Sequence, residues 1–267
     1  MYPNRRRRVK TDRRDARMLA EAARVGRYRP AHRVSAEQRH VRRQLCVRDL
    51  LVRSRVRVIA AMRALVRSEG LRVRAGTADR FGIYVQELTL PDALAVTMKP
   101  LLAVWQHLTD QLALADAALG ETAAANPVVQ RLATAPGVGP LIATAFVATL
   151  DEAGRFAGAH QVASYLGLVP SEGSSADRRR RGPITKAGDP RMRWLMVQAA
   201  WAARRSRRAD AAGLRAWAEQ LAKRRGSPIA TVALARRLTG ILFAMWRDHA
   251  PFDGQCVGAG IPTPARG

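Results

Sequence analysis

Apolar residues recur every seven positions in two long stretches of the chain. The first begins after Ser35, where Ser-x-x-Gln is close to a helix-capping box. Each ladder predicts a long helix with a broad apolar stripe. The ladder positions are Leu45, Val52, Ile59 and Val66 in the first helix and Met98, Leu101, Trp105, Leu108, Leu112, Ala115 and Leu119 in the second.

The segment 70–91 between the ladders is expected to be a loop with a short apolar island, FGIYVQEL. Two ladders joined by a loop favour an antiparallel helical hairpin, formed within one chain or exchanged between protomers, although an ordinary bundle without a partner chain fits the periodicity equally well. Pro100 is expected to mark a first turn or a kink of the second helix.

Helical spacing continues through most of the remaining sequence. Helices are expected from Asp12 to Val25, after the capping residue Asn126, from Met192 to Ala203 and from Pro228 onward. No stretch alternates apolar and polar residues as a strand would. The sequence therefore predicts a mainly α fold.

Charge changes this picture from a plain helical protein to one with a polyanionic partner. The 267 residues include 46 Lys and Arg against 21 Asp and Glu, a formal net charge of +25, and nearly all of the positive charge is arginine. A GC-rich genome would explain arginine over lysine but not the shortage of acids. Nucleic acid is the simplest partner, because the arginine fork grips phosphate oxygens with two hydrogen bonds.

Several other protein classes are excluded by composition. Cys46 and Cys256 are too few and too far apart for a disulfide framework or a zinc site. No apolar run reaches the roughly 18 residues of a membrane span, and the basic start MYPNRRRRVK is not followed by the apolar stretch of a secretory signal. We expect a cytoplasmic protein.

The segment VVQRLATAPGVGPLIATAFVATL predicts a helix, a Pro-Gly-Val-Gly turn and a second helix. This is the pattern of a helix-hairpin-helix, in which Gly137 and Gly139 would let backbone amides approach a phosphate. A tight turn between packed helices would need similar glycines. We favour the DNA-contacting interpretation.

Asp12 and Asp15 lie three residues apart at the start of the first predicted helix, so both carboxylates can share one face. Such a pair binds Mg²⁺ if other carboxylates join it. The alternative is that Asp12 is the N-cap and Asp15 the acid at the third helical position, favourable with the helix dipole. Spacing alone favours capping.

The stretch from Ser171 to Arg193, SEGSSADRRRRGPITKAGDPRMR, places two serines beside four arginines. No histidine stands near enough in sequence to form a hydrolase triad, and His160 lies in a predicted helix before the loop. Positive surroundings suit attack on a phosphodiester better than attack on an acyl group. The alternative is a flexible basic loop that touches the DNA backbone.

Three motifs resemble the DEDD-type transposases of bacterial insertion sequences, the group numbered one-ten and one-sixteen, which are relatives of the Piv invertase and are guided by a bridge RNA. They are KTDRRDA, PGVG and LGLVPSEGSSADRRRRGPITKAGDPRMR, and the likeness runs from about Val9 to Phe252. The resemblance implies an RNase-H-like domain in which four acids bind Mg²⁺, a coiled coil, and a helical transposase domain whose serine bonds covalently to DNA. It also implies DNA and guide RNA as partners, a homodimer or tetramer, and the bacterial cytoplasm.

Carried over by position, Asp12 and Asp15 match the third and fourth acids, which are catalytic and bind metal. Ser175 matches the nucleophile, with Ser174 as the alternative, and Ala176 replaces the usual glycine. Gly182 and Gly188 would shape the loop. The nucleic-acid contacts implied are Gly137, Gly139, Arg178, Arg179, Arg180, Arg181, Thr185, Lys186 and Arg193.

The first Asp and the Glu of the family precede the KTDxxDA helix and are missing from this sequence. We therefore expect residues 1–34 to be a remnant of the RNase-H-like domain, 35–125 a coiled-coil region, 126–250 the transposase domain and 251–267 a disordered tail. With half of the carboxylates missing, Mg²⁺ should bind weakly or not at all. The prediction is a transposase impaired by N-terminal truncation; the alternative is a non-enzymatic DNA- or RNA-binding remnant or regulator of the element.

Overall fold

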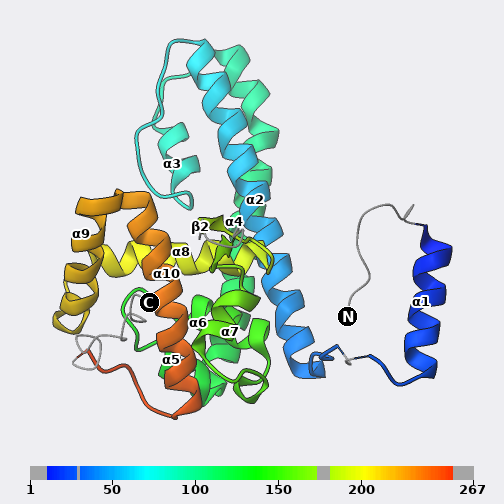
Figure 1. The fold of residues 1–267 in the computed structure, drawn as a ribbon. Coiled ribbons are helices and arrows are strands. Elements are labelled where there is room, and N and C mark those ends of the chain that lie inside the picture. Colours follow the sequence, from blue (N-terminus) through cyan, green and yellow to red (C-terminus); the bar gives the residue numbers. More distant parts are fainter. Residues whose placement is uncertain (1–10, 29–30, 173–180, 255–267) are drawn as a thin grey trace. The chain divides into compact units, whose positions relative to one another are not determined.

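The chain is built almost entirely of helices, as the sequence predicts (Figure 1). The structure is a computed structural model that describes residues 11–28, 31–172 and 181–254. It divides into two compact units, Met1–Val34 and Ser35–Gly267.

The first unit contains one helix, α1 (Asp12–Arg24), which closes at Gly26 with a φ of +64°. Its N-cap is Thr11 and not Asp12, so the capping assignment for Asp12 is wrong by one residue and both acids lie inside the first turn. The helix buries none of its side chains, and Leu19 is 72% exposed.

The predicted hairpin is formed within one chain by α2 (Ala36–Ser68) and α4 (Asp92–Ala125), which lie side by side (Figure 1). Ser35 caps α2 by accepting a hydrogen bond from the amide of Gln38, as the capping pattern predicts. Most ladder positions become buried where the two helices meet, because an apolar stripe on each helix covers the other. The buried ladder residues are Leu45, Ile59, Val66, Met98, Trp105, Leu112 and Leu119.

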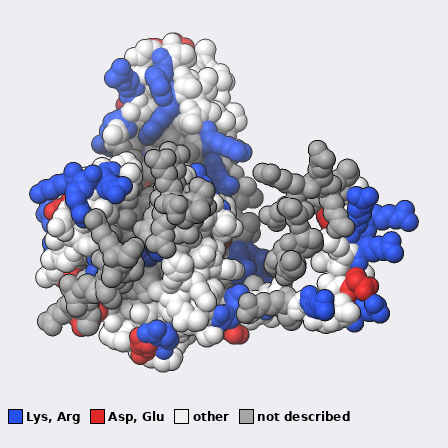
Figure 2. Space-filling view, in the orientation of Figure 1, with Lys and Arg blue, Asp and Glu red and all other residues white. Residues whose placement is uncertain are grey.

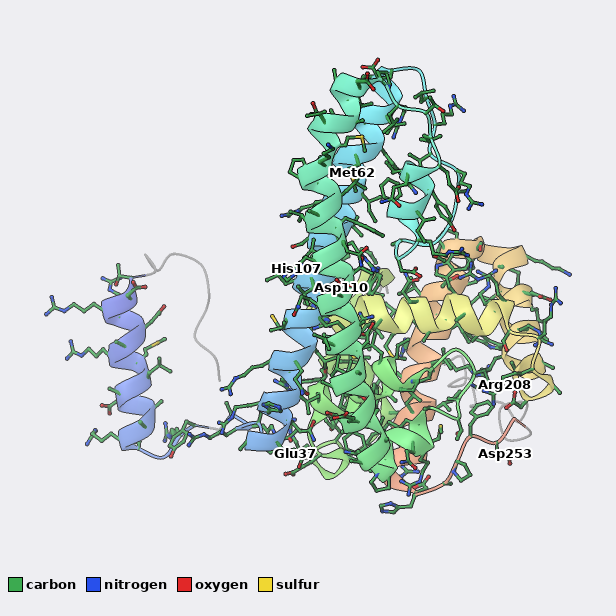
Figure 3. The ribbon with its side chains drawn as sticks, turned by 180° about the vertical axis from the view of Figure 1, so that it is seen from behind. Glu37, Met62, His107, Asp110, Arg208 and Asp253 are labelled. Atoms are coloured by element: carbon green, nitrogen blue, oxygen red, sulfur yellow. The ribbon has the colours of Figure 1, made fainter. Side chains whose placement is uncertain are left out.

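The tip of the hairpin differs from the expected loop. The apolar island forms a short helix, α3 (Phe81–Gln86), which buries Phe81 and Val85 in a cluster with residues of α2 and α4. Met62 of α2 is fully buried in this cluster (Figure 3). Pro100 lies inside α4, which begins at Asp92, so its assignment to a first turn is wrong.

The base of the hairpin enters a second and larger apolar core. Val41 and Leu45 of α2 and Leu119 and Ala123 of α4 pack there against the C-terminal helices. α6 is buried from Ala143 through Leu150 and lies near the centre of this core. The elements after the hairpin are α5 (Pro127–Leu132), α6 (Pro140–Leu150), η1 (Ala153–Arg155), α7 (Ala159–Tyr165), β1 (Pro170–Glu172), β2 (Arg181–Ile184), α8 (Pro190–Arg205), η2 (Ala209–Ala211), α9 (Ala212–Arg225) and α10 (Ser227–Arg247).

A buried carboxylate ties the hairpin to this core. Asp151, at the end of α6, accepts hydrogen bonds from the Ser35 hydroxyl at 2.7 Å and from the Ser35 amide at 3.0 Å. The first turn of α2 is thereby held against the last turn of α6.

α10 is long and apolar enough by composition to cross a membrane, the one such helix in the described parts of the chain. More than half of its apolar window (56%) is buried inside the protein, which is the behaviour of a core helix. The chain then continues into the segment predicted as a disordered tail. Its described start contacts the core, since Phe252 packs there and its amide donates to Thr134 Oγ1 at 3.0 Å.

Candidate functional site

Two short antiparallel strands close the base of the serine–arginine segment. β1 and β2 pair Pro170 with Ile184 and Glu172 with Arg181, with an irregularity between the two pairs. The Ser171 hydroxyl donates to the Pro183 carbonyl at 2.9 Å. Sequence analysis missed these strands because three and four residues are too few for an alternating pattern to be seen.

The predicted nucleophile and its neighbours lie outside the described residues. These are Ser174, Ser175, Ala176 and Arg178–Arg180; for Arg181 only the backbone is described. The described part of the site is the base of the loop and the residues that surround it.

Two glycines seat this base against the end of α7. At Gly188 a Cβ would lie 2.0 Å from the carbonyl oxygen of Tyr165, and at Gly167, whose φ is +69°, a Cβ would lie 2.6 Å from the Ala187 amide nitrogen. Hydrogen bonds cross the same contact, from the Lys186 amide to the Gly167 carbonyl (3.1 Å) and from the Thr185 amide to the Val169 carbonyl (2.9 Å). The L-G-L and K-A-G motifs thus bring two backbone segments into direct contact, and the contact leaves no room for a side chain at either glycine.

The next residues begin α8 and lock the turn in place. Asp189 Oδ1 accepts hydrogen bonds from the amides of Arg191 and Met192, and Pro190 occupies the first turn. Arg193 Nη1 donates to the carbonyls of Gly188 (2.5 Å) and Leu166 (3.3 Å). Part of the Arg193 guanidinium, predicted to contact nucleic acid, is therefore engaged inside the protein.

The other predicted phosphate contacts of the turn, Thr185 and Lys186, are both exposed. Lys186 has a φ of +55°, a left-handed backbone conformation that residues other than glycine rarely adopt. Its backbone is held there by the bond from its amide to Gly167. Their contact with nucleic acid remains a prediction.

A groove of about 520 Å³ lies beside the loop base, between α2, α6 and the start of α8. Ala187, Gly188 and Asp189 line one side of it. Residues of α2 line the other side, namely Arg42, Leu45, Cys46, Asp49 and Arg53. Arg42 is held by the carbonyls of Ala148 and Thr149 at the end of α6, and Arg53 forms an ion pair with Asp49.

Arg191 lies in the groove beside the loop base. It belongs to the first turn of α8 and is partly buried. Burial lowers the pKa of its guanidinium, while Asp49 and Asp189 act in the opposite direction. A partly desolvated guanidinium gains more from an anion than a fully hydrated one. Arg191 is not among the nucleic-acid contacts predicted from the sequence, although it follows directly after the capping Asp189-Pro190.

The two glycines of the predicted helix-hairpin-helix have different environments. At Gly137, whose φ is +80°, a Cβ would lie 2.2 Å from the Ala199 carbonyl oxygen, so close packing against α8 accounts for this glycine. Gly139, the exposed N-cap of α6, has no atom within 4 Å of such a Cβ. A DNA contact at this turn remains a prediction, and Gly139 is the residue that is open to it.

Asp12 and Asp15 lie in the first turn of α1, Asp12 exposed and Asp15 partly so. Among the residues that the structure describes, no group of three or more His, Cys, Asp or Glu side chains could hold a metal ion. Two carboxylates leave most of the six ligand positions of Mg²⁺ to other groups. The described residues therefore do not form a complete Mg²⁺ site.

Comparison with known proteins gives the family. A family model described as Transposase IS116/IS110/IS902 family matches residues 129–214, which contain most of α5, all of α6 to α8 and the strand pair. The transposase for insertion sequence element IS1111A of Coxiella burnetii is 32% identical over 243 residues, covering 88% of this chain and 66% of that protein. A probable family 20 transposase of Pseudomonas aeruginosa is 31% identical, covering 88% and 72%.

A third relative, the transposase for insertion sequence element IS1328 of Yersinia enterocolitica, is 27% identical and covers 78% of this chain. The chain spans about two thirds of the length of these relatives, between 63% and 72%. The resemblance seen in the sequence motifs is confirmed at the level of the family. This chain belongs to the IS116/IS110/IS902 family of insertion-sequence transposases.

Proposed function

We propose that the chain is the DNA-processing part of an insertion-sequence transposase, with Ser175 as the nucleophile that cuts a DNA strand. The observation that supports this most directly is the way the base of the serine–arginine segment is held. β1–β2 and the Gly167 and Gly188 contacts anchor both ends of the segment next to the groove that contains Arg191. A reactive loop on a rigid base limits the positions from which its hydroxyl attacks.

In the proposed step, Oγ of Ser175 attacks a phosphorus atom of the DNA backbone. The Oγ–P bond forms as the bond from phosphorus to the leaving strand oxygen breaks. The serine loses its hydroxyl proton, and the leaving oxygen gains one and becomes a free hydroxyl. The strand is then held as a phosphoserine ester, and reversal by a different strand end joins new DNA.

The basic side chains around the loop would stabilise the charge that builds up on the phosphate in this step. Arg178–Arg181 and Lys186 carry this role in the proposal, with Thr185 and Arg191 as further contacts. Asp12 and Asp15 would supply two of the Mg²⁺ ligands that the family resemblance implies. Among the described residues, no third His, Cys, Asp or Glu ligand joins these two acids.

The partners in this proposal are DNA, a guide RNA and further copies of the chain in a homodimer or tetramer. DNA follows most directly, since the relatives are transposases of insertion sequences. The +25 net charge supports both nucleic acids. If the chain bound nucleic acid without cutting it, the alternative of a binding remnant or regulator would hold instead.

The test is to trap the covalent adduct. The chain, and a chimera in which it follows the N-terminal part of the Pseudomonas relative, are incubated with Mg²⁺, guide RNA and labelled element-end DNA and then denatured. We expect an adduct from the chimera that disappears in Ser175→Ala and persists in the matched control Ser174→Ala. The purified chain alone is expected to form none, because its described acids do not complete a Mg²⁺ site.

An adduct that survives Ser175→Ala but not Ser174→Ala would show that Ser174, and not Ser175, is the nucleophile. An adduct formed by the unfused chain would show that its own acids suffice. No adduct from any form, together with intact DNA binding, would favour the non-enzymatic alternative.

A further inference from the structure

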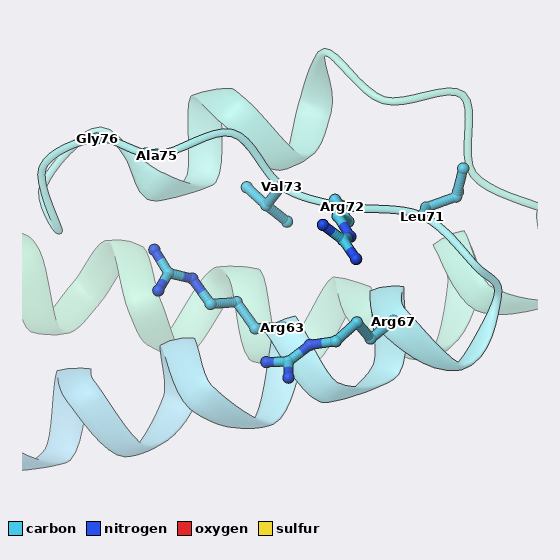
Figure 4. Close-up of a pocket in the computed structure, with 7 residues that line it drawn as sticks. All are labelled: Arg63, Arg67, Leu71, Arg72, Val73, Ala75 and Gly76. Atoms are coloured by element: carbon cyan, nitrogen blue, oxygen red, sulfur yellow. The ribbon is translucent and has the colours of Figure 1, made fainter.

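The tip of the hairpin carries an arginine pocket far along the chain from the serine loop. The pocket has a volume of about 590 Å³ and lies between α2 and the loop of residues 71–76. Arg63 and Arg67, one helical turn apart on α2, and Arg72 on the loop line it (Figure 4). The remaining lining is small or apolar: Leu71, Val73, Ala75 and Gly76.

The loop that forms one wall is held by the apolar cluster beneath it. At Gly76 a Cβ would lie 2.2 Å from the ring of Tyr84, so the loop backbone rests directly on that side chain. The indole N–H of Trp105 donates to the Ala78 carbonyl at 3.0 Å. α3 packs on the same indole through Gly82, where a Cβ would lie 2.1 Å from the ring. The pocket is therefore built on a fixed backbone.

Among the described residues, no acid forms an ion pair with an arginine of the pocket. Between residues 55 and 88 the chain has seven arginines and three acids, so the segment has a net positive charge. Two of these acids are matched elsewhere. Glu87 pairs with Arg74 at 3.1 Å, and the pKa of Asp79 is lowered by its own backbone amide, by Thr77 and by Arg55 and Arg80.

By contrast, the guanidinium groups of Arg63, Arg67 and Arg72 form no hydrogen bond or ion pair with any described residue. The Arg63 guanidinium also lies over the face of Phe81, at 5.2 Å from the ring centre. Basic side chains gather over this end of the hairpin in the space-filling view (Figure 2). Three like charges around one hollow repel one another, and a bound anion would relieve that repulsion.

We propose that this hairpin-tip pocket is a separate nucleic-acid contact that binds the phosphodiester backbone of DNA or RNA. Three guanidinium forks suit phosphate oxygens, which they grip in pairs, and the wall of Leu71 and Val73 suits the apolar face of a sugar. The pocket shares no lining residue with the groove beside the serine loop, and it lies on the other apolar cluster. The inference therefore does not depend on the chemistry of Ser175.

The test compares two variants of equal charge. One carries Arg63→Gln, Arg67→Gln and Arg72→Gln. The control carries Arg39→Gln, Arg43→Gln and Arg224→Gln, three other exposed arginines whose side chains form no hydrogen bond or ion pair with a described residue. Binding of the full chain to a labelled duplex DNA and to a labelled hairpin RNA is measured by fluorescence anisotropy at several salt concentrations. The thermal midpoint of each variant checks that the fold is retained.

We expect the tip variant to bind at least one of the two probes about tenfold more weakly or worse. The slope of log K against log salt should fall by about 2 to 3, one phosphate for each arginine removed. The control should retain most of its affinity. The arm that shows the loss identifies DNA or RNA as the ligand.

A second readout uses the unmodified protein. Arginine modification by phenylglyoxal, read by mass spectrometry, should be slower at Arg63, Arg67 and Arg72 when the bound probe is present, and unchanged by inorganic phosphate at the same phosphate concentration. Equal losses in the tip and control variants, no protection, or protection by inorganic phosphate alone would overturn the proposal.

Discussion

At the scale of single residues, several arginine side chains donate hydrogen bonds to other groups within the fold. Arg204 Nη1 donates to Ser227 Oγ at 2.7 Å and to Thr231 Oγ1 at 2.6 Å, which joins the end of α8 to the start of α10. Arg208 reaches the Thr134 carbonyl at 2.8 Å, and Arg215 reaches two carbonyls of the preceding turn. A guanidinium has five donors, so one arginine satisfies several backbone groups at once. Composition therefore overstates how many arginines are free for a partner.

Gly188 gives the sharpest prediction at this scale. We expect Gly188→Ala to lower the free energy of unfolding by about 1–3 kcal/mol, because the new methyl group would overlap the Tyr165 carbonyl and the backbone would have to move. The loop base would move with it, so DNA cleavage should also fall. Urea unfolding measures the first effect and the adduct assay the second.

Gly120→Ala is the matched control, since Gly120 lies on exposed α4 surface with no atom within 4 Å of a new Cβ. It should raise stability by about 0.5–1 kcal/mol, as alanine does in a helix interior. Equal effects of the two substitutions would contradict the packing argument.

At the scale of elements, the hairpin is anchored in two separate apolar clusters. Its base shares the large core with α6 and α10, while its tip is stabilised by its own cluster around Met62, Phe81 and Trp105. Such an arrangement allows the tip to loosen without the core, because the two clusters share no residue.

Truncation of Met62 tests this independence. Met62→Ala should remove about 2–5 kcal/mol of packing, and the effect should be local. We expect faster amide hydrogen exchange in residues 70–90 and unchanged protection in α6 and α10. Phe146→Ala, in the large core, should instead lower protection across the C-terminal helices. A uniform loss of protection in Met62→Ala would contradict two separate clusters.

At the scale of the whole molecule, the surface through which copies of the chain would associate is the outer faces of the hairpin helices and not the heptad ladders. Most of the ladder residues are already buried within a single chain, so these residues are not free for a second copy. The outer faces of both helices nevertheless keep large apolar side chains exposed. These are Val47, Leu50 and Val56 on α2 and Val96, Val104 and Leu114 on α4, each 47–64% exposed.

We expect the purified chain to form a dimer or tetramer through these outer faces, because covering exposed apolar side chains is favourable. Light scattering measures the mass. Leu50→Glu with Leu114→Glu should shift the protein toward the monomer, whereas Arg39→Gln with Arg43→Gln should not. A monomer at concentrations of about tens of micromolar, within the range of specific protein association, would exclude this prediction.

Much of the helical framework was predictable because its signals are local. The Ser35 cap, the Asn126-Pro127 start and the seven-residue ladders each depend on residues within one or two turns, and the helices begin and run where these signals indicate. The family was predictable for the same reason, since its motifs are short runs that can be read without a fold. α3 and the two strands were missed, because each is too short to show a period of its own.

By itself the sequence determined a mainly α chain, its long helices, its excess of arginine and its family. Only the tertiary structure decided that the two ladders pair within one chain, and that Gly137 serves packing against α8. It also decided that Gly167 and Gly188 join the two sides of the loop base. It decided as well which arginines form hydrogen bonds within the fold and which line the hairpin-tip pocket without an ion-pair partner among the described residues. The physical reason is the same in each case: these facts depend on contacts between residues far apart in the chain, and no local pattern records which backbone or charge will lie opposite.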